Sequence, residues 1–186
     1  VVLLYSGVCK VNAAIAAQLL IDRFAVDCIL NAGTAGGIQE HVQLFDTVIS
    51  ERIAYHDVAR NLLTEFHPWM DSEYFYADKK LLRIAQDYRI TTKNPILFGT
   101  MVSGEQFVTD DNRAHILEIF APLCTDMETA AIAHVCLVNQ LPFLAIRTIT
   151  DTAEHKGVEE FEKNCEAASA IAAKITCDLL PLFAAA

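Results

Sequence analysis

Two acidic residues in the segment Cys124-Thr-Asp-Met-Glu128 stand directly before an alanine-rich amphipathic run. A short extended segment that leads into a helix is where α/β sheets commonly carry ligand sites. In extended backbone, Asp126 and Glu128 point to the same side and Met127 to the other. Carboxylates beside an apolar thioether suit a ligand with adjacent hydroxyls and an apolar body, such as a ribose. The same acids could instead complement the amino terminus of the helix, so both interpretations stay open here.

Asp151 is the second candidate, because it ends the apolar run of residues 142–150. An ionised carboxylate at the end of a buried strand is costly unless it has a partner. Burial there would raise its pKa and let it act as a general acid near neutral pH. The structural alternatives are a cap for the following helix or an ion pair with Arg147.

Residues 32–37, Ala-Gly-Thr-Ala-Gly-Gly, follow a short apolar run and predict a glycine-rich turn. Such a turn lets backbone approach a ligand and present N–H groups to it. The glycine spacing matches neither the dinucleotide fingerprint nor the P-loop. Standing alone, the segment would be a tight turn without a ligand.

The order of apolar residues predicts alternating strands and helices. Strands are expected at residues 1–5, 27–31, 46–55, 95–103 and 142–150, and helices at residues 10–24, 77–88, 110–120 and 158–186, the last broken near Pro181. Residues 57–76 lack a clean period and predict a long surface excursion. The pattern indicates one three-layer α/β domain over residues 1–186, with helices on both faces of a sheet. Four strand ends (33–37, 103–107, 126–128 and 147–151) should then meet at one edge.

Composition narrows the classes of partner. The 186 residues can bury a full core, and 53% hydrophobic against 20% charged residues excludes disorder. A formal charge of −10 disfavours nucleic acid and favours a small, weakly charged substrate. No uninterrupted apolar run reaches the roughly 18 residues that span a bilayer, so a membrane partner is not expected.

The six cysteines include no Cys-x-x-Cys pair, and most stand in apolar contexts. They indicate reduced core residues of a cytoplasmic protein. No histidine or cysteine cluster has metal-ligand spacing, so neither a metal nor a cofactor is expected. His56 and His134 are more typical of structural histidines than of catalytic ones, since His134 lies on an apolar helix and His56 borders the excursion.

The chain resembles the 5′-methylthioadenosine/S-adenosylhomocysteine nucleosidases of the nucleoside phosphorylase superfamily. The resemblance is carried, in family order, by residues 6–11, 31–37, 55–57, 102–108, 126–134 and 147–151. It implies a three-layer αβα sandwich with a central mixed sheet of the phosphorylase/hydrolase-like kind. The implied activity is hydrolysis of the bond between adenine and ribose in these nucleosides, in methionine salvage, without a cofactor. The family also implies a homodimer whose partner closes the pocket around the 5′ substituent.

The resemblance also implies residue roles. Asp151 matches the acid that protonates the purine at N7, Glu128 the carboxylate that holds the ribose hydroxyls, and Met127 the residue under the sugar. The other implied substrate-binding positions are Val8 near the ribose or alkylthio group, Thr34, Ala35 and Gly36 beneath the sugar, Phe107 and Val108 along the purine, Phe161 over the base, and Asp126, Arg147 and Thr150 within the matching motifs. The chemistry fits independently, because N-glycoside cleavage needs an acid on the leaving group and negative charge near a cationic sugar.

Three departures from the family pattern stand out. Thr34 replaces the usual serine and keeps the hydroxyl, whereas Asp126 replaces a common glutamate and shortens any contact it makes. Family members also begin with a strand whose end carries a water-activating glutamate, and we expect that segment upstream of Val1. As written, the chain is therefore expected to bind a nucleoside better than it cleaves one.

Three other functions compete with this interpretation. A phosphorylase would use phosphate as the nucleophile, but hexameric phosphorylases typically place an arginine just before the glycine turn, where this chain has Asn31. A binding protein without turnover would stabilise on adding ligand and release no adenine. A nucleosidase for another adenine-bearing substrate, such as aminodeoxyfutalosine, would differ around the 5′ substituent, which the sequence does not settle.

Overall fold

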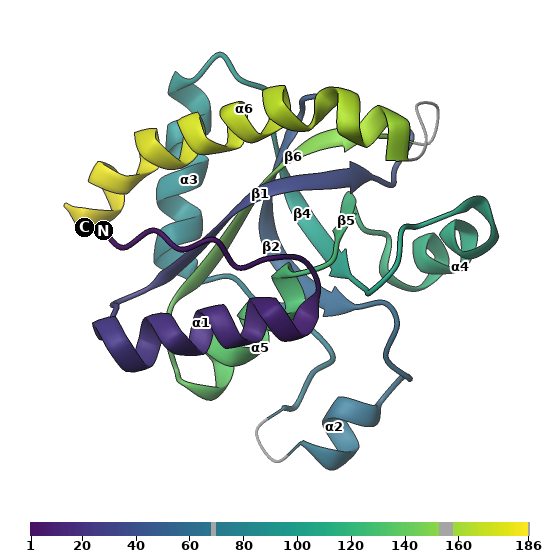
Figure 1. Ribbon diagram of the computed structural model, residues 1–186, viewed down its shortest axis with the longest axis horizontal. Helices are drawn as coiled ribbons and strands as arrows, with labels where there is room; N and C mark the ends of the chain where they lie inside the picture. Colours follow the sequence, from purple (N-terminus) through teal and green to yellow (C-terminus); the bar gives the residue numbers. More distant parts are fainter. Residues whose placement is uncertain (68–69, 153–157, 186) are drawn as a thin grey trace.

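A computed structural model describes residues 1–67, 70–152 and 158–185 of the chain (Figure 1). Its elements in chain order are α1 (Lys10–Phe24), β1 (Ile29–Gly37), β2 (Thr47–Tyr55), α2 (Leu62–Phe66), β3 (Phe75–Tyr76), α3 (Lys79–Thr91), β4 (Ile96–Ser103), α4 (Asp110–Phe120), β5 (Cys124–Asp126), α5 (Thr129–Val138), β6 (Phe143–Asp151) and α6 (Val158–Ala184). Most helices and strands therefore lie where the apolar pattern predicts them.

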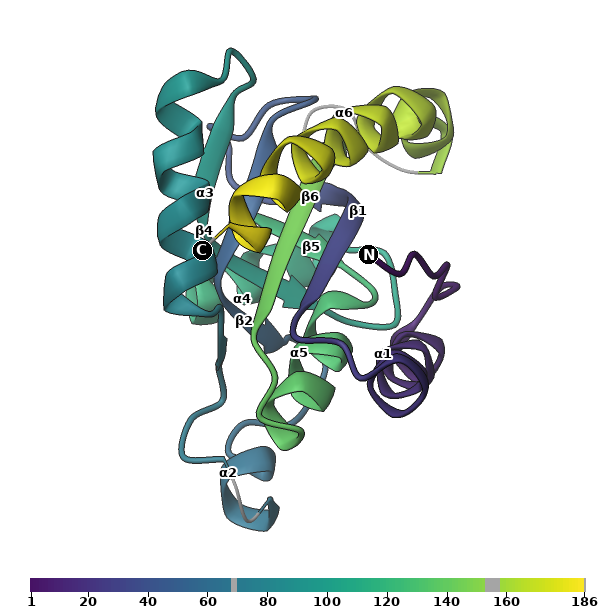
Figure 2. The ribbon, with the colours of Figure 1, turned by 90° about the vertical axis from the view of Figure 1, so that its left-hand side faces the viewer.

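The described strands form one mixed sheet in the order β3-β2-β4-β5-β1-β6, and β6 also pairs with β2, so the sheet curls on itself. The pairs β1–β6, β2–β4 and β4–β5 are parallel, whereas β1–β5, β2–β3 and β2–β6 are antiparallel. Helices α1 and α5 lie on one side of the sheet, and α3 and α6 lie on the other (Figures 1 and 2). The predicted α/β fold with a central mixed sheet is confirmed.

Local sequence signals start the helices at these positions. Helix α4 begins with a capping box in which Thr109 and Asn112 bond each other's backbone N–H, and acids occupy its first turn. Helix α3 begins at Asp78, whose carboxylate accepts from two backbone N–H groups of the first turn. These polar caps satisfy N–H groups that have no partner within the helix.

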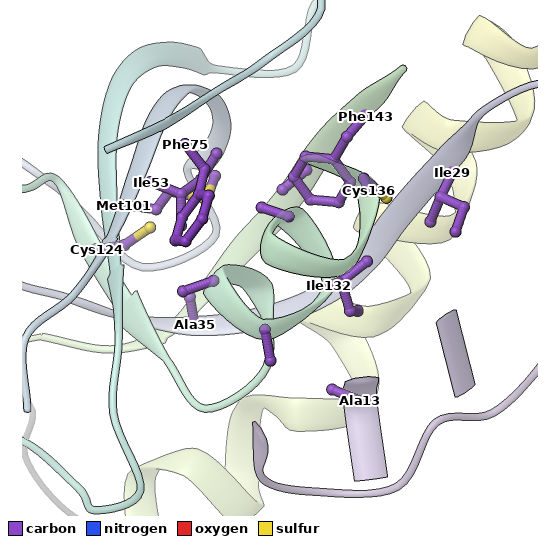
Figure 3. Close-up of a cluster of buried hydrophobic side chains, with 14 of the residues drawn as sticks. Ala13, Ile29, Ala35, Ile53, Phe75, Met101, Cys124, Ile132, Cys136 and Phe143 are labelled. Atoms are coloured by element: carbon purple, nitrogen blue, oxygen red, sulfur yellow. The ribbon is translucent and has the colours of Figure 1, made fainter. Parts of the chain in front are cut away.

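Strand β6 runs through the centre of the core and is buried on both faces. Leu144 and Ile146 belong to the apolar cluster beneath α3 and α6, whereas Ala145 and Ile149 belong to the cluster beneath α1 and α5. Figure 3 shows part of the second cluster, with side chains from α1, α5 and several strands meeting. Because side chains alternate along a strand, Arg147 must project to the α5 side.

Residues 1–5 were predicted as a buried strand, and this prediction is wrong for the structure. They form no regular element, and Leu3 and Tyr5 are 97% and 89% exposed. A strand needs a hydrogen-bonded neighbour, and none pairs with this segment within the described residues. The apolar pattern registers side-chain character but not the presence of a neighbouring strand.

The prediction of a glycine-rich turn at residues 32–37 is also wrong. Strand β1 continues to Gly37 as nine extended residues, with an irregularity between Ala35 and Gly36, because its parallel pairing with β6 continues through the glycines.

Two further predictions about element bounds differ from the structure. Helix α6 does not break at Pro181 but continues to Ala184. The excursion contains α2 and the short strand β3, which pairs with β2.

Among the described residues, α6 is the helix that is long and apolar enough, by length and composition alone, to cross a membrane. Its buried residues Ala168, Ala172, Ile175 and Leu179 recur at helical spacing and pack in the core. Helix α6 contacts both β6 and β1. This arrangement is typical of a core helix covering a sheet.

Candidate active site

A buried arginine, Arg147 of β6, organises the site. Its Nη2 lies 2.8 Å from Asp126 Oδ2 and 3.4 Å from Glu128 Oε2. Its Nε donates to Thr129 Oγ1 at 3.1 Å, and its Nη1 donates to the carbonyl of Thr34 at 3.1 Å. A guanidinium that is only 5% exposed requires such a full set of acceptors. Arg147 therefore ties the start of α5 to strand β1.

Asp126 lies at the centre of this network rather than at its surface. It is 8% exposed, and its oxygens accept from the Ser103 hydroxyl and from the hydroxyl and backbone N–H of Thr129. Together with the ion pair to Arg147, these bonds occupy both oxygens. Of the two interpretations left open by the sequence, capping of the helix start is realised for Asp126, and its geometry favours positioning over direct ligand contact.

Glu128 is more accessible and faces two donors. Its Oε1 accepts the backbone N–H of Cys9 at 3.0 Å, and its Oε2 faces Arg147. Burial raises the pKa of Glu128, although the charge of Arg147 opposes that rise. A carboxylate oxygen has more than one lone pair, so Glu128 retains acceptor capacity for hydroxyl groups of a ligand.

Asp151 ends β6 in a partly buried position. Burial raises the pKa of its carboxyl group, and the hydrogen bond that Thr150 Oγ1 donates to Oδ1 at 2.8 Å only partly counters this. The raised pKa agrees in direction with the expectation from the sequence. Thr150 is itself fully buried, and its hydroxyl also lies 3.3 Å from the carbonyl oxygen of Ala35, so it orients Asp151 from within the fold.

The glycines of β1 make room for these side chains. Gly33 pairs with Arg147 across the parallel strands, and Gly36 pairs with Asp151. A Cβ at Gly33 would lie 2.6 Å from Arg147 Nη1, and one at Gly36 would lie 2.9 Å from Asp151 Oδ2. The sequence predicts that these glycines allow close approach. In the structure, the groups that approach them are the side chains of Arg147 and Asp151.

Two aromatic rings from distant segments come together beside this region. The rings of Phe107 and Phe161 are edge to face, with centroids 6.1 Å apart and planes at 74°. Phe107 is 47% exposed. Val108 is partly buried and packs its side chain against an apolar cluster that includes Val102.

The remaining predicted positions vary in access. Val8 is 54% exposed, directly before the Cys9 N–H that binds Glu128. Met127 and Thr34 are partly buried. Ala35 has its side chain in the core and its carbonyl bonded to Thr150. The side chain of Ala35 is therefore not available to a ligand.

Sequence reasoning missed several polar groups of the network. Ser103 donates to Asp126 and accepts the backbone N–H of Ala130 at 2.9 Å. Thr129 accepts from Asn31 Nδ2 at 2.9 Å as well as from Arg147. A threonine directly after Glu128 and three residues after Asp126, at a helix start, is a signal that could have indicated such a cap.

His134 lies in a separate set of contacts. His134 Nδ1 is 3.3 Å from the Tyr55 hydroxyl, and its Nε2 is 2.9 Å from His67 Nε2. Its ring also lies against Phe75. Within residues 1–67, 70–152 and 158–185, no cluster of three metal-ligating side chains is present.

The four strand ends meet, but for a different reason from the one expected. The antiparallel pairing of β1 with β5 is confined to Gly36 and Gly37 opposite Thr125 and Cys124, so the carboxyl end of β1 lies beside the first residues of the three-residue strand β5. β4 and β6 then run parallel to β5 and β1 respectively. The ends of the parallel pair β1–β6 and of the parallel pair β4–β5 therefore lie next to each other.

Comparison with known proteins agrees with this architecture. The phosphorylase superfamily model matches residues 1–181. A 5′-methylthioadenosine/S-adenosylhomocysteine nucleosidase of Listeria innocua is 37% identical over 175 residues, which cover 88% of this chain and 73% of the relative. One from Bacillus pumilus is 35% identical over 175 residues, covering 91% of this chain and 75% of the relative.

Solved structures give the same result. The nucleosidase of this type from Neisseria meningitidis, in complex with methylthio-immucillin-A, superimposes with a TM-score of 0.83 at 31% identity, covering 94% of this chain and 78% of that one. A Borrelia burgdorferi protein bound to adenine gives a TM-score of 0.87 at 31% identity, covering 95% and 78%. The chain belongs to the phosphorylase superfamily, within the family of the 5′-methylthioadenosine/S-adenosylhomocysteine nucleosidases.

Proposed function

We propose that this protein hydrolyses the N-glycosidic bond of 5′-methylthioadenosine and S-adenosylhomocysteine, releasing adenine and a 5-substituted ribose. One observation carries the proposal. Strand β6 bears both Arg147, which holds Glu128, and Asp151, whose pKa is raised, and both lie against glycines of β1. A potential acid and a hydroxyl-binding carboxylate are thus held from the same pair of strands.

The reaction requires these two groups to act in opposite protonation states. Asp151 donates its proton to N7 of the purine, so that adenine leaves as a neutral molecule, and a pKa raised by burial keeps that proton available. Glu128 accepts the ribose hydroxyls and places negative charge near the sugar as it becomes cationic. Burial raises the pKa of Glu128, and the charge of Arg147 opposes that rise and orients the carboxylate for this task.

The neighbouring residues supply the rest of the proposed nucleoside site. The ring of Phe107 lies against the purine, Phe161 closes over it, and the main chain of Val108 meets its edge. Met127 lies under the sugar, with the β1 backbone of Thr34, Ala35 and Gly36 beneath it and Val8 near the ribose or the 5′ substituent. Asp126, Thr150 and Arg147 position the two acting carboxylates.

Hydrolysis is preferred to phosphorolysis for a reason visible in β1. Asn31, two residues before Gly33, donates to Thr129 and so belongs to the network behind Glu128. An amide in this position has no positive charge with which to bind a phosphate nucleophile. We therefore propose that water is the attacking group.

We further propose that the protein is a cytoplasmic homodimer that acts in methionine salvage. Val11, Ile15 and Leu19 are spaced by four residues along α1 and are 66%, 54% and 41% exposed. An apolar stripe of this kind marks a contact surface in many proteins. All six cysteines lie in the described residues and are free thiols, which agrees with a reducing compartment.

Adenine release from 5′-methylthioadenosine, measured with and without phosphate, tests the proposed reaction. Both this chain and a version extended by the amino-terminal strand of its relatives are measured. We expect little release from the first and rapid, phosphate-independent release from the extended version. Asp151→Asn in the extended version should lower that release about 100-fold or more, because the amide cannot protonate N7. Glu159→Gln, an equally small change in the first turn of α6, is the control and should keep the rate. Release that requires phosphate would favour a phosphorylase. Binding without release in the extended version would favour a non-catalytic relative.

A further inference from the structure

A ring of polar contacts joins three segments of the chain outside the network of Arg147. Lys10 Nζ lies 3.0 Å from Asp57 Oδ1 and 2.9 Å from Asp57 Oδ2. Asp57 Oδ2 also accepts the backbone N–H of Glu105 at 3.0 Å. Glu105 Oε1 in turn accepts the backbone N–H of Lys10 at 3.2 Å. Each of the three residues thus contacts the other two, and the ring is closed.

The three members come from segments far apart in sequence. Lys10 begins α1, Asp57 follows β2, and Glu105 follows β4. The last two segments also approach each other closely, because a Cβ at Gly104 would overlap the imidazole ring of His56. The ammonium of Lys10 also lies 5.3 Å from the centre of the Tyr55 ring. The segments after β2 and β4 are therefore packed closely against each other and against the start of α1.

Two of these segments carry parts of the proposed nucleoside site. Cys9, directly before Lys10, donates its backbone N–H to Glu128, on the sugar side. Phe107, two residues after Glu105, belongs to the base side and contacts Phe161. The ring thus lies between the group that orients the ribose-binding carboxylate and the segment that supports the purine.

We propose that Lys10 is a positioning residue, which fixes the separation between the sugar-binding and base-binding halves of the site through Asp57 and Glu105. This inference rests on the proposed function, since it concerns the nucleoside that spans both halves. The side chains of Lys10 and Asp57 are 22% and 21% exposed. A partly exposed ion pair contributes little to global stability, so the ring acts through geometry.

The charge state of Asp57 agrees with this role. Burial alone would raise the pKa of its carboxyl group. The hydrogen bonds from Lys10 and from the Glu105 N–H outweigh that effect and hold the pKa below its usual value. Asp57 is therefore ionised at neutral pH and accepts from both neighbours at once.

Binding of two ligands of different length tests the proposal. Methylthio-immucillin-A, a nucleoside analogue, should contact both halves of the site, whereas adenine should contact only the base side. In Lys10→Met we expect the Kd for the analogue to rise about tenfold, because misplacing one half weakens only a ligand that needs both. The Kd for adenine should change by less than about twofold, within the error of such comparisons.

Three further variants separate positioning from general damage. Asp57→Asn should raise the Kd for the analogue to the same degree. The double variant should not raise it further than either single variant does, because both substitutions break the same contact. Lys10→Arg should recover most of the affinity, since its guanidinium can pair with Asp57. Lys174→Met breaks another ion pair, in which Lys174 Nζ lies 2.7 Å from Asp178 Oδ2 on α6. It should leave the Kd for both ligands unchanged.

The outcomes distinguish this inference from the proposed function. The positioning role would be overturned, with the proposed function intact, by any of three outcomes. The Kd for both ligands could rise equally in Lys10→Met, neither Kd could rise, or the effects of the two substitutions could add in the double variant. An unsubstituted protein that binds neither ligand would overturn the proposed function together with it.

Discussion

At the scale of single residues, the site holds one backbone conformation that is costly for its side chain. Cys9 has φ 77° and ψ 162°, a region populated almost only by glycine. That conformation aims the Cys9 N–H at Glu128. The strain is therefore located at the contact that orients the proposed ribose-binding carboxylate.

Cys9→Gly should raise the free energy of unfolding. Relief of the backbone strain gains about 1–3 kcal/mol, and the greater freedom of glycine in the unfolded chain removes about 0.5–1 kcal/mol of that gain. We expect a net stabilisation of about 1 kcal/mol by urea unfolding. The matched control is Cys165→Gly, which places glycine inside α6 and should destabilise by about 1 kcal/mol. Destabilisation by both variants would contradict the strain at Cys9.

At the scale of elements, the pairing of β1 with β6 decides which side chains meet. Gly36 lies opposite Asp151, and its missing Cβ leaves room for Oδ2. Gly99 of β4 is a useful comparison because its Cβ would lie 2.7 Å from Leu123 Cδ1, a contact between apolar groups. Replacing each glycine by alanine therefore crowds Asp151 in one case and an apolar side chain in the other.

Gly36→Ala should move the Asp151 carboxylate, because a Cβ 2.9 Å from Oδ2 requires that side chain to shift. We expect kcat for adenine release to fall about tenfold or more, the effect of misplacing a catalytic group by a fraction of an ångström. Gly99→Ala should lower the Tm to a similar extent through crowding while leaving kcat unchanged. A normal kcat in Gly36→Ala would mean that Asp151 tolerates displacement or is not the acid.

The sequence predicts elements far better than it predicts their neighbours. The apolar spacing places α1 and α4 at their observed bounds, because a buried helix face leaves a local pattern. Residues 1–5 have the same apolar character as a core strand and yet are exposed, since pairing depends on distant backbone. The glycines within residues 33–37 predict a turn. The segment instead continues β1, because it pairs with β6 in a register that sets Gly33 opposite Arg147 and Gly36 opposite Asp151.

The candidate site is predictable in part for the same reason. Asp151 is visible because an ionised carboxylate at the end of an apolar strand is costly unless it has a partner, and Glu128 because it stands with Asp126 directly before a helix. The role of Phe107 follows only from the family resemblance. The ring formed by Lys10, Asp57 and Glu105 is not visible, because its members are separated by 47 and 48 positions along the chain. A common surface lysine and two acids carry no local signal of their pairing.

At the scale of the whole molecule, α1 presents an apolar face that the single chain does not cover. Val11, Ile15 and Leu19 lie on one side of the helix, while its buried residues Ala13, Ala16 and Ala17 face the core. Near the end of α5, Asn139 donates to Gln18 of α1 at 3.0 Å, and the neighbouring Leu137 and Val138 are each 42% exposed. The exposed apolar surface thus extends from α1 towards α5.

Ile15→Glu should separate the proposed homodimer, because the carboxylate would be desolvated at the centre of the apolar stripe. Light scattering should give twice the chain mass of 20.5 kDa for the unsubstituted protein and the single chain mass for the variant. Ile90→Glu is the matched control, since Ile90 is 83% exposed near the end of α3, on the other side of the sheet. It should leave the mass unchanged. A monomeric unsubstituted protein at working concentration would contradict the dimer, whereas loss of dimer in both variants would place the contact elsewhere than on α1.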